Sequence, residues 1–476
     1  MLGTSRKNLE VAKNASESAL ARILAVPRRS RGSRAGGVCP LRWGAACVGV
    51  VGIVAVVAVV GVAGCGGQAG QGGTPTCPEG TECTTQSPAA DPVDAASAEA
   101  GPAQGSVDAL RPWFRGGPGT PTPLGVAGPE TAPSLLWEVD LGAAITAQPT
   151  LAAVVGGEVA AFVGTHAGRF SGVLVSGPKA GTIAVDLNVP GMIFGTAAKA
   201  TDGSLVFGAD NDRVYAADPV AGTFVWSRLV GTCDPPRGRG PEGTRCDPDG
   251  GPTVGAGGDI YIGADGVYRL SSAGEVRWHY PPPESGPTWH VGAAPLVTRE
   301  GEVFVGGEDG ALIALDRDGA LRWRVELGPD VDAAPVLLNN GLVVAAADDG
   351  RVIGFDQQGE ERWAFTAGKE VRAALAVAED GTIYAAALDG QLYALRPDGA
   401  LRWSFAAGGP IATAPVVDRE GRVYFGSRDD FVYAVDRSGH ERWRLELPED
   451  VDAALAISEG GVLLVGCDDG VLRGYR

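Results

Sequence analysis

From residue 135 to the C-terminus, short apolar runs alternate with polar turn tripeptides at a period of about 40 residues. In the unit at 331–367, the runs VDAAPVLL, LVVAAA, RVIGFD and EERWAFTA are separated by the tripeptides NNG, DDG and QQG. Runs rich in branched and aromatic residues, bounded by Asn, Asp and Gly, are typical of strands joined by hairpins. Each unit therefore predicts four short antiparallel strands.

A tryptophan recurs on the fourth predicted strand of the units. Its positions are Trp137, Trp226, Trp278, Trp323, Trp363, Trp403 and Trp443, of which the last four are 40 residues apart. Ile183 takes the tryptophan position in the long gap between the first two, which makes eight units. Four strands in about 40 residues are typical of a β-propeller blade. The sequence predicts an all-β fold, a single eight-bladed β-propeller over residues 135–476, with the tryptophans packed between blades.

The turns and the two ends of the repeat region support the same fold. Glycines recur where tight hairpins need a positive φ, at Gly310, Gly350, Gly390 and Gly470 in one turn and Gly319, Gly359, Gly399 and Gly439 in the next. The last unit ends at Arg476 without its tryptophan strand, whereas residues 135–141 form a spare one. We therefore expect the N-terminal strand to complete the eighth blade, which would cover an open sheet edge.

The N-terminal region has the character of an export signal. Residues 1–42 carry nine basic and two acidic residues, and residues 43–64 carry no charge. Twenty-two uncharged residues just reach the length of roughly 20 that a membrane-spanning helix needs. Basic residues remain on the cytoplasmic side of a membrane, so we expect everything after residue 64 to be exported into the cell envelope.

The uncharged segment ends in Val62-Ala63-Gly64-Cys65, which resembles the lipobox of bacterial lipoproteins. This resemblance implies cleavage before Cys65, acylation of its thiol and new amino group, and stable anchoring by more than one acyl chain. An uncleaved signal anchor is the main alternative, and ordinary cleavage is another. Residues 65–134 are rich in Gly, Pro, Ala, Thr and Ser, and we expect them to be a disordered tether.

Two cysteine pairs flank short loops. Cys77 and Cys83 enclose PEGTE, and Cys233 and Cys246 enclose DPPRGRGPEGTR. In an exported protein such pairs favour disulfides over a metal site. Cys467 is left over, and we expect it to be a small buried apolar residue within a strand.

Composition and charge exclude several classes. The 73 glycines and 33 prolines are too many for a long-helix protein, while 45% hydrophobic residues exclude wholesale disorder. The chain has a net charge of −18; residues 1–42 contribute +7, so −18 minus +7 leaves −25 for the rest. Nucleic-acid binding depends on Lys and Arg. The acidic exported part therefore predicts no nucleic-acid partner.

The best repeats resemble a known family. GEVFVGGEDGALIALDRDGALRW (301–323) and GRVYFGSRDDFVYAVDRSGHERW (421–443) are similar to the pyrroloquinoline-quinone (PQQ) type of propeller repeat. Two branches share this repeat: quinoprotein dehydrogenases, and lipoproteins similar to the B subunit of the outer-membrane β-barrel assembly machinery. The second branch implies eight blades, a lipidated cysteine and no catalysis. The chain lacks the adjacent cysteine pair that is characteristic of the first.

Strand order predicts an acidic binding face. The turn between the second and third strands and the loop between successive blades should open on one side of a propeller. This side is either a solvated acidic rim that aids solubility or a surface that steers a basic partner, for which these acids are the candidate contacts: Asp309, Asp349, Asp389, Asp430 and Asp469.

Two irregular loops belong to the same predicted face. One contains Arg237 and Arg239, and the other contains Trp289, which is outside the repeat phase, and His290. A tryptophan in a proline-rich loop is a candidate interface anchor, although packing on its own blade is equally open. On the innermost strands, Asp332, Arg372 and Asp452 are predicted to line the axial channel and to pair with one another.

The sequence contains no motif for catalysis. Its four histidines are scattered, and no phosphate loop, GxSxG or HExxH is present. We therefore predict a non-enzymatic, membrane-anchored, monomeric propeller without a metal or cofactor, which binds envelope proteins, with barrel-assembly components as the candidates. Two alternatives remain: a quinone-binding or other small-ligand-binding protein, and an envelope recognition or sensor propeller.

Overall fold

The computed structural model describes residues 125–231, 247–281 and 290–476, which lie in one compact unit. The predicted leader, the lipobox cysteine Cys65 and most of the predicted tether lie outside the described residues. So do the four cysteines of the two predicted disulfides. Within the described ranges, no helix has the length and apolar character that crossing a membrane would require.

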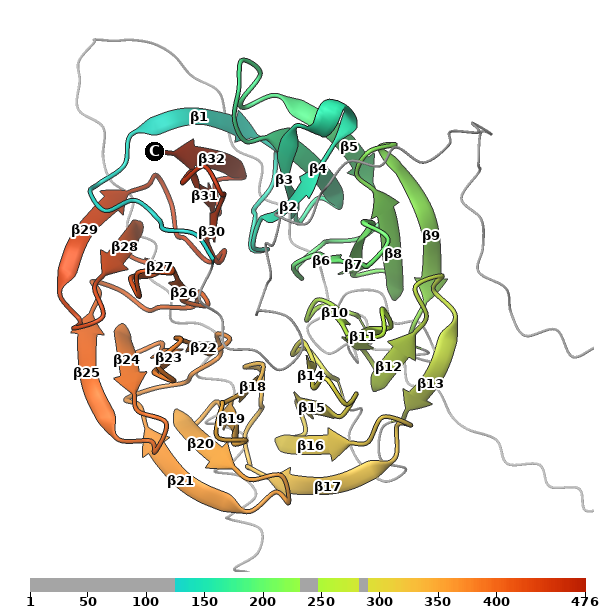
Figure 1. Ribbon diagram of the computed structural model, residues 1–476, viewed down its shortest axis with the longest axis vertical. Helices are drawn as coiled ribbons and strands as arrows, with labels where there is room; N and C mark the ends of the chain where they lie inside the picture. The colour runs from blue at the N-terminus through green and yellow to red at the C-terminus, as the bar shows by residue number, and fades with distance from the viewer. Residues whose placement is uncertain (1–124, 232–246, 282–289) are drawn as a thin grey trace, which may run out of the picture. The chain divides into compact units, whose positions relative to one another are not determined.

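Eight four-stranded antiparallel sheets form a ring, which confirms the predicted fold (Figure 1). Seven blades use four strands that are consecutive in the chain. We call the strands of each blade A to D from the axis outward, and we number the blades in chain order. The first strand of each consecutive set lies innermost, around the axis (Figure 1).

The first four blades begin with the strand after β1. Blade 1 contains β2 (Thr150–Ala153), β3 (Val159–Gly164), β4 (Arg169–Leu174) and β5 (Ile183–Asn188), with a short 3-10 turn η1 (Val155–Gly157). Blade 2 contains β6 (Ala198–Lys199), β7 (Leu205–Ala209), β8 (Arg213–Asp218) and β9 (Thr223–Leu229). Blade 3 contains β10 (Thr253–Val254), β11 (Ile260–Gly263), β12 (Val267–Leu270) and β13 (Val276–Tyr280). Blade 4 contains β14 (Leu296–Val297), β15 (Val303–Gly306), β16 (Ala311–Leu315) and β17 (Leu321–Glu326).

The other four blades follow the 40-residue repeat closely. Blade 5 contains β18 (Val336–Leu337), β19 (Val343–Ala346), β20 (Arg351–Phe355) and β21 (Glu361–Thr366). Blade 6 contains β22 (Ala376–Val377), β23 (Ile383–Ala386), β24 (Gln391–Leu395) and β25 (Leu401–Ala406). Blade 7 contains β26 (Val416–Val417), β27 (Val423–Ser427), β28 (Phe431–Val435) and β29 (Glu441–Glu446). Blade 8 contains β30 (Ala456–Ile457), β31 (Leu463–Gly466), β32 (Val471–Tyr475) and, as its D strand, β1 (Leu135–Asp140).

The N-terminal strand closes the ring, as the sequence predicts. Strand β1 pairs antiparallel with β32, with Trp137 opposite Gly474. Ser134 and Arg476 exchange two backbone hydrogen bonds of 2.8 Å each. The two ends of the repeat region are thereby joined, and β32 has no open edge.

The B strands form the core of each blade. All residues of β15, β19, β23 and β31 are buried, because neighbouring blades cover both faces of these strands. The D strands instead alternate between exposed and buried positions, as in β29, since only one of their faces meets another blade. The apolar runs in the sequence therefore correspond to the middle of each blade.

The tryptophans pack between blades, as predicted. Trp323 of blade 4 donates its indole N–H to the carbonyl of Gln357 in blade 5, at 3.0 Å. A Cβ on Gly359, in the same blade 5 turn, would lie 2.8 Å from the Trp323 ring. Gly359 also has a φ of 82°. This turn therefore requires glycine for two reasons, its backbone conformation and the close approach of the neighbouring indole.

Candidate interaction surface

The B–C turns and the D–A loops meet on one face of the propeller, which we call the B–C face. In blades 1, 2 and 4 to 8 a backbone N–H of the B–C turn donates to a carbonyl of the D–A loop that enters the same blade. In blade 5, for example, the Asp348 N–H bonds the Asp330 carbonyl at 2.9 Å, and in blade 8 the Asp468 N–H bonds the Asp450 carbonyl at 3.2 Å. The structure thus places both sets of acidic residues on the predicted face.

Four of the five acids predicted to contact a partner are bonded to their own blades. Asp309 forms an ion pair with Arg324 at 2.9 Å, Asp349 with Arg351 at 2.7 Å, and Asp469 with Arg473 at 2.5 Å. Asp389 accepts a hydrogen bond of 2.6 Å from the Tyr393 hydroxyl. Each carboxylate also accepts the backbone N–H of the first residue of the C strand that follows its turn. These side chains therefore order the turns, and their role in binding stays a prediction.

The fifth acid, Asp430, lies at a position where most other blades have glycine. Its φ is 69°, compared with 86° for the equivalent Gly350. Asp212 occupies the same position in blade 2, with a φ of 61°. Asp tolerates this left-handed conformation better than most residues. Asp430 therefore satisfies the turn while it adds a carboxylate to the face.

Other carboxylates gather near the axis. They come mainly from the D–A loops and from the B–C turns, where they stand one residue before the acids described above. One group surrounds Arg372, and its members are Glu308, Asp330, Asp332 and Asp348. Arg372 pairs with Asp348 at 2.7 Å, and the Asp348 side chain is only 8% exposed. Burial, followed by repulsion from Asp332, raises the pKa of Asp348 to about 6. A single arginine thus does not neutralise this group.

A second group surrounds Arg428 and consists of Asp450, Asp452 and Asp468. Arg428 donates to both oxygens of Asp452, at 2.9 and 2.8 Å. Burial and the charges of Asp452 and Asp450 raise the pKa of Asp468 to about 6. The predicted pairing of Asp332, Arg372 and Asp452 with one another is therefore wrong. Arg372 instead pairs with Asp348 of blade 5, and Asp452 pairs with Arg428 of blade 7.

The third group has no counterpart in the sequence analysis. One carboxylate oxygen each from Asp210, Asp247 and Asp249 lies within 4.8 Å of the others. Burial, then the charges of Asp249, Asp210 and Asp212, raises the pKa of Asp247 to about 7. Carboxylate oxygens are the ligands that hard cations such as Ca²⁺ prefer, although Ca²⁺ takes six to eight of them. These residues are the candidate ligands for a cation on this face.

His290 connects the first and third groups. Its Nδ1 lies 3.0 Å from Glu308 Oε1, and its Nε2 lies 3.0 Å from the Asp247 carbonyl. The residue is 2% exposed. Burial alone would lower the pKa of His290, but the hydrogen bond to Glu308 raises it above the ordinary value. The predicted contact residue His290 is therefore a buried link between two loops.

Comparison with known proteins agrees with this architecture. The family model described as outer membrane protein assembly factor BamB, a model of PQQ-type repeats, matches residues 263–368 and 348–476. Residues 263–476 are thus similar to the PQQ-type repeats of BamB. No curated protein sequence matches it significantly.

Solved structures similar to this BamB-like propeller differ widely in kind. The crystal structure of BamB from Moraxella catarrhalis is 18% identical with a TM-score of 0.56, covering 72% of this chain and all of that one. The computationally designed Ika8 protein is 17% identical with a TM-score of 0.56, covering 72% of this chain and 99% of its own. A europium-containing methanol dehydrogenase is 14% identical with a TM-score of 0.55, covering 70% and 84%. At these identities the likeness shows the fold alone, and PQQ-type propellers include enzymes.

Several predicted residues of this BamB-like propeller lie outside the described residues. These are Cys65, Cys77, Cys83, Cys233, Cys246, Arg237, Arg239 and Trp289. Cys467 is described and is fully buried, as predicted, but it follows the end of β31 instead of lying within a strand. Its thiol donates to the carbonyls of Glu449 and Asp450, at 3.3 Å each.

The sequence analysis missed the Asp210, Asp247 and Asp249 group for an identifiable reason. Asp210 belongs to a B–C turn that aligns with the turn at 308–310, so the repeat register could have placed it on the face. Asp247 and Asp249 belong to the long insertion after β9, where no repeat register applies. Only the folded insertion brings them to Asp210.

Proposed function

We propose that the protein is a non-enzymatic scaffold of the cell envelope, exported and membrane-anchored through Cys65 or an uncleaved signal anchor. In this proposal its B–C face binds a basic surface of an envelope protein, and outer-membrane protein assembly is the process to test first. The family match to an outer membrane protein assembly factor supports the process. The lipobox-like sequence before Cys65 supports the location.

One observation carries the proposed binding mode: the groups around Arg372 and Arg428 keep unneutralised carboxylates close to the axis. The seven carboxylates of these groups share two arginines and, at Glu308, the imidazole of His290. Raised pKa values at Asp348 and Asp468 mean that bringing a positive charge to this face would favour their ionised forms. A basic partner would thus gain both long-range attraction and local pairing.

Crosslinking in native membranes tests this function. A photoreactive residue would replace Glu449 on the B–C face, with Glu300 on the opposite face as the matched control. We expect the photoreactive residue at position 449 to crosslink to envelope proteins, among them barrel-assembly components. The double variant Asp332→Asn, Asp452→Asn should weaken the crosslink, and so should added salt, which screens the charges. Equal crosslinking from both faces would contradict the proposed binding face, and the absence of assembly components would contradict the proposed process.

A second candidate function, cation-dependent binding of a small ligand, is favoured by the Asp210, Asp247 and Asp249 group. Calorimetric titration with Ca²⁺, followed by ultraviolet-visible spectra with added quinone, would separate this function from the scaffold. The scaffold proposal expects no bound chromophore and no loss of partner crosslinks in Asp249→Asn. A stoichiometric quinone spectrum that Asp249→Asn abolishes would favour the second candidate.

A further inference from the structure

On the face opposite to the B–C face, the groove between blades 7 and 8 is filled by residues 126–130 of the chain itself. The Gly128 N–H donates to Asp418 Oδ2 at 2.9 Å, and the Val126 carbonyl accepts from the Arg419 N–H at 3.1 Å. Gly128 lies so close to Tyr424 that an added Cβ would be 2.6 Å from the tyrosine oxygen. In this fold, a groove between two blades can therefore hold an extended, glycine-containing segment.

The filling of this groove follows from the way the ring closes. Trp403 of blade 6 donates its indole N–H to the Arg437 carbonyl, in the C–D turn of blade 7, at 2.9 Å. Blade 8 has no C–D turn, because its D strand is β1, from the other end of the repeat region. Trp443 of blade 7 donates instead to the Pro129 carbonyl, at 3.0 Å. Pro129 therefore replaces the missing turn.

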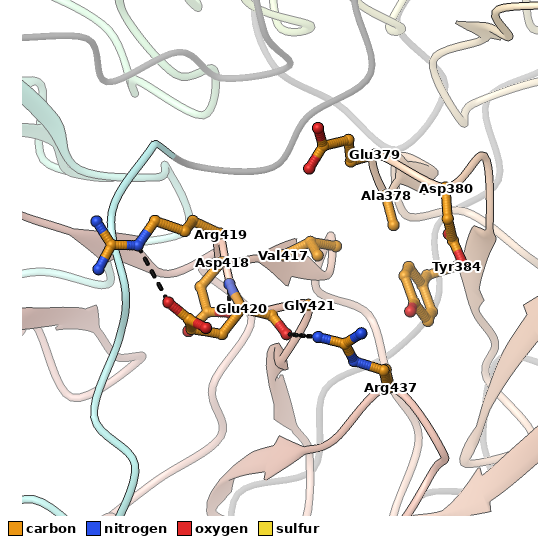
Figure 2. Close-up of a pocket in the computed structure, with 10 residues that line it drawn as sticks. All are labelled: Ala378, Glu379, Asp380, Tyr384, Val417, Asp418, Arg419, Glu420, Gly421 and Arg437. Atoms are coloured by element: carbon orange, nitrogen blue, oxygen red, sulfur yellow. Dashed lines mark hydrogen bonds and ion pairs between the residues drawn. The ribbon is translucent and has the colours of Figure 1, made fainter.

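The groove between blades 6 and 7 has the same aromatic wall one repeat earlier, but Ala378 takes the position of Asp418. Tyr384 and Trp403 have a ring separation of 5.8 Å and an interplanar angle of 47°, the same values as Tyr424 and Trp443. No described segment lies in this groove at the position equivalent to that of Gly128 in the groove between blades 7 and 8. A cavity of about 250 Å³ remains, with Tyr384 and Val417 among its walls (Figure 2). This volume is slightly below the usual 300–1,000 Å³ of small-molecule sites and suits a short peptide stretch.

The Tyr384 hydroxyl makes no hydrogen bond within the described residues, and Tyr384 lines the cavity. In the filled groove, the Tyr424 hydroxyl reaches both the Pro129 carbonyl at 3.2 Å and Asp418 Oδ2 at 3.1 Å. Burial, then the charge of Asp380, raises the pKa of Tyr384 to about 12, so the hydroxyl remains a donor at neutral pH. A carbonyl supplied by a ligand would give this hydroxyl an acceptor.

The charges around the cavity favour a basic residue on the ligand. Arg419 pairs with the Glu420 side chain at 3.1 Å, and Arg437 donates to the Glu420 carbonyl at 2.8 Å. Asp380 pairs with Arg402 at 2.8 Å. The exposed Glu379, at the opening in Figure 2, makes no ion pair within the described part of the chain. Its carboxylate is therefore available to a lysine or arginine.

We propose that the groove between blades 6 and 7 binds an extended peptide segment of a partner protein, with glycine in the cavity and a basic residue beside it. The glycine fits between Tyr384 and Val417, as Gly128 fits between Tyr424 and Ile457. A peptide carbonyl accepts from the Tyr384 hydroxyl, and the basic side chain pairs with Glu379. This surface lies on the opposite face from the proposed acidic interface, so each proposal can be tested without the other.

Fluorescence anisotropy of labelled peptides, added to the full-length protein in detergent, tests the proposal. The probes are Val-Ala-Gly-Pro-Lys, which is residues 126–129 followed by lysine, and the same peptide ending in glutamate. We expect saturable binding that is tighter for the lysine peptide. Tyr384→Phe should weaken it about fivefold, the effect of one hydrogen bond of roughly 1 kcal/mol, and Val417→Trp should abolish it by filling the cavity.

Glu379→Gln should remove the preference for lysine, whereas Glu459→Gln, at the equivalent turn position of blade 8, should leave it unchanged. Unaltered affinity in Tyr384→Phe and Glu379→Gln would overturn the proposal even if Val417→Trp failed to fold. The predicted tether also contains the Gly-Pro pair Gly117-Pro118. Binding that appears only after this pair is replaced would also overturn the proposal, because the occupant would then be the protein's own chain. Equal affinity for the two peptides would exclude the proposed basic ligand.

Discussion

At the residue scale, one class of turn glycine carries the contact between blades. Gly319, Gly359, Gly399 and Gly439 have φ values of 81–84°, and each lies against the tryptophan of the preceding blade. The sequence predicts the backbone conformation from the hairpin pattern. It does not predict the contact, because the tryptophan belongs to a different hairpin.

Gly359→Ala separates these two requirements. Gly341 has a φ of 86° and no neighbour within 4 Å of an added Cβ, so Gly341→Ala is a matched control with the same backbone strain. We expect both variants to lower the free energy of unfolding, with an extra loss of about 1–3 kcal/mol for Gly359→Ala from overpacking against Trp323. Urea unfolding followed by tryptophan fluorescence measures the difference. Equal losses would mean that the indole moves aside freely.

Asp247 makes stability depend on pH in an unusual direction. Its folded-state pKa of about 7 lies above the ordinary value of an aspartate, so the folded state favours the protonated form. The stability that this carboxyl contributes is complete below its unfolded pKa of roughly 4 and is lost as the pH rises through about 7. We expect unfolding at pH 8 to be easier than at pH 5, and Asp247→Asn to reduce that difference. Glu300→Gln, on the other face, should not reduce it.

At the element scale, residues 126–130 act as a substitute turn for blade 8. The sequence analysis assigned them to the tether, because their composition continues that of residues 65–124. Their hydrogen bonds to Asp418, Tyr424 and Trp443 depend on groups almost 300 residues away. Composition reports local preference only, so no property of the segment itself indicated where it would bind.

Gly128→Ala should disturb this substitute turn. An added Cβ would lie 2.6 Å from the Tyr424 oxygen and 2.7 Å from Ile457 Cδ1, whereas a Cβ on Gly125 would contact nothing within 4 Å. We expect Gly128→Ala to lower the free energy of unfolding by about 1–3 kcal/mol. Gly125→Ala should change it by less than about 0.5 kcal/mol. Thermal unfolding of the two variants checks this, and similar transitions would show that the segment contributes little to closure.

At the scale of the whole molecule, β1 decides whether the ring is closed. Deletion of residues 135–140 would leave β32 as an open edge strand, and open edges pair with other chains. We expect the deletion variant to form oligomers or aggregates, and the intact chain to remain monomeric. Size-exclusion chromatography with light scattering distinguishes the two. Leu136→Thr, which changes an exposed side chain of β1 but preserves the strand, is the control and should remain monomeric.

The sequence by itself determined the blade count, the strand order, the positive-φ turns and the closing strand. These features repeat every 40 residues or so, and each depends on contacts within one hairpin or with the adjacent unit. Tertiary structure decided which acids are bonded to their own blades, how Arg372 and Arg428 choose partners, and how an insertion brings Asp247 and Asp249 to Asp210. It also decided that the groove beside Tyr384 is open, whereas the groove beside Tyr424 is filled. The reason is physical: a repeat fixes local geometry, whereas pairing and filling depend on distances between residues that are far apart in the chain.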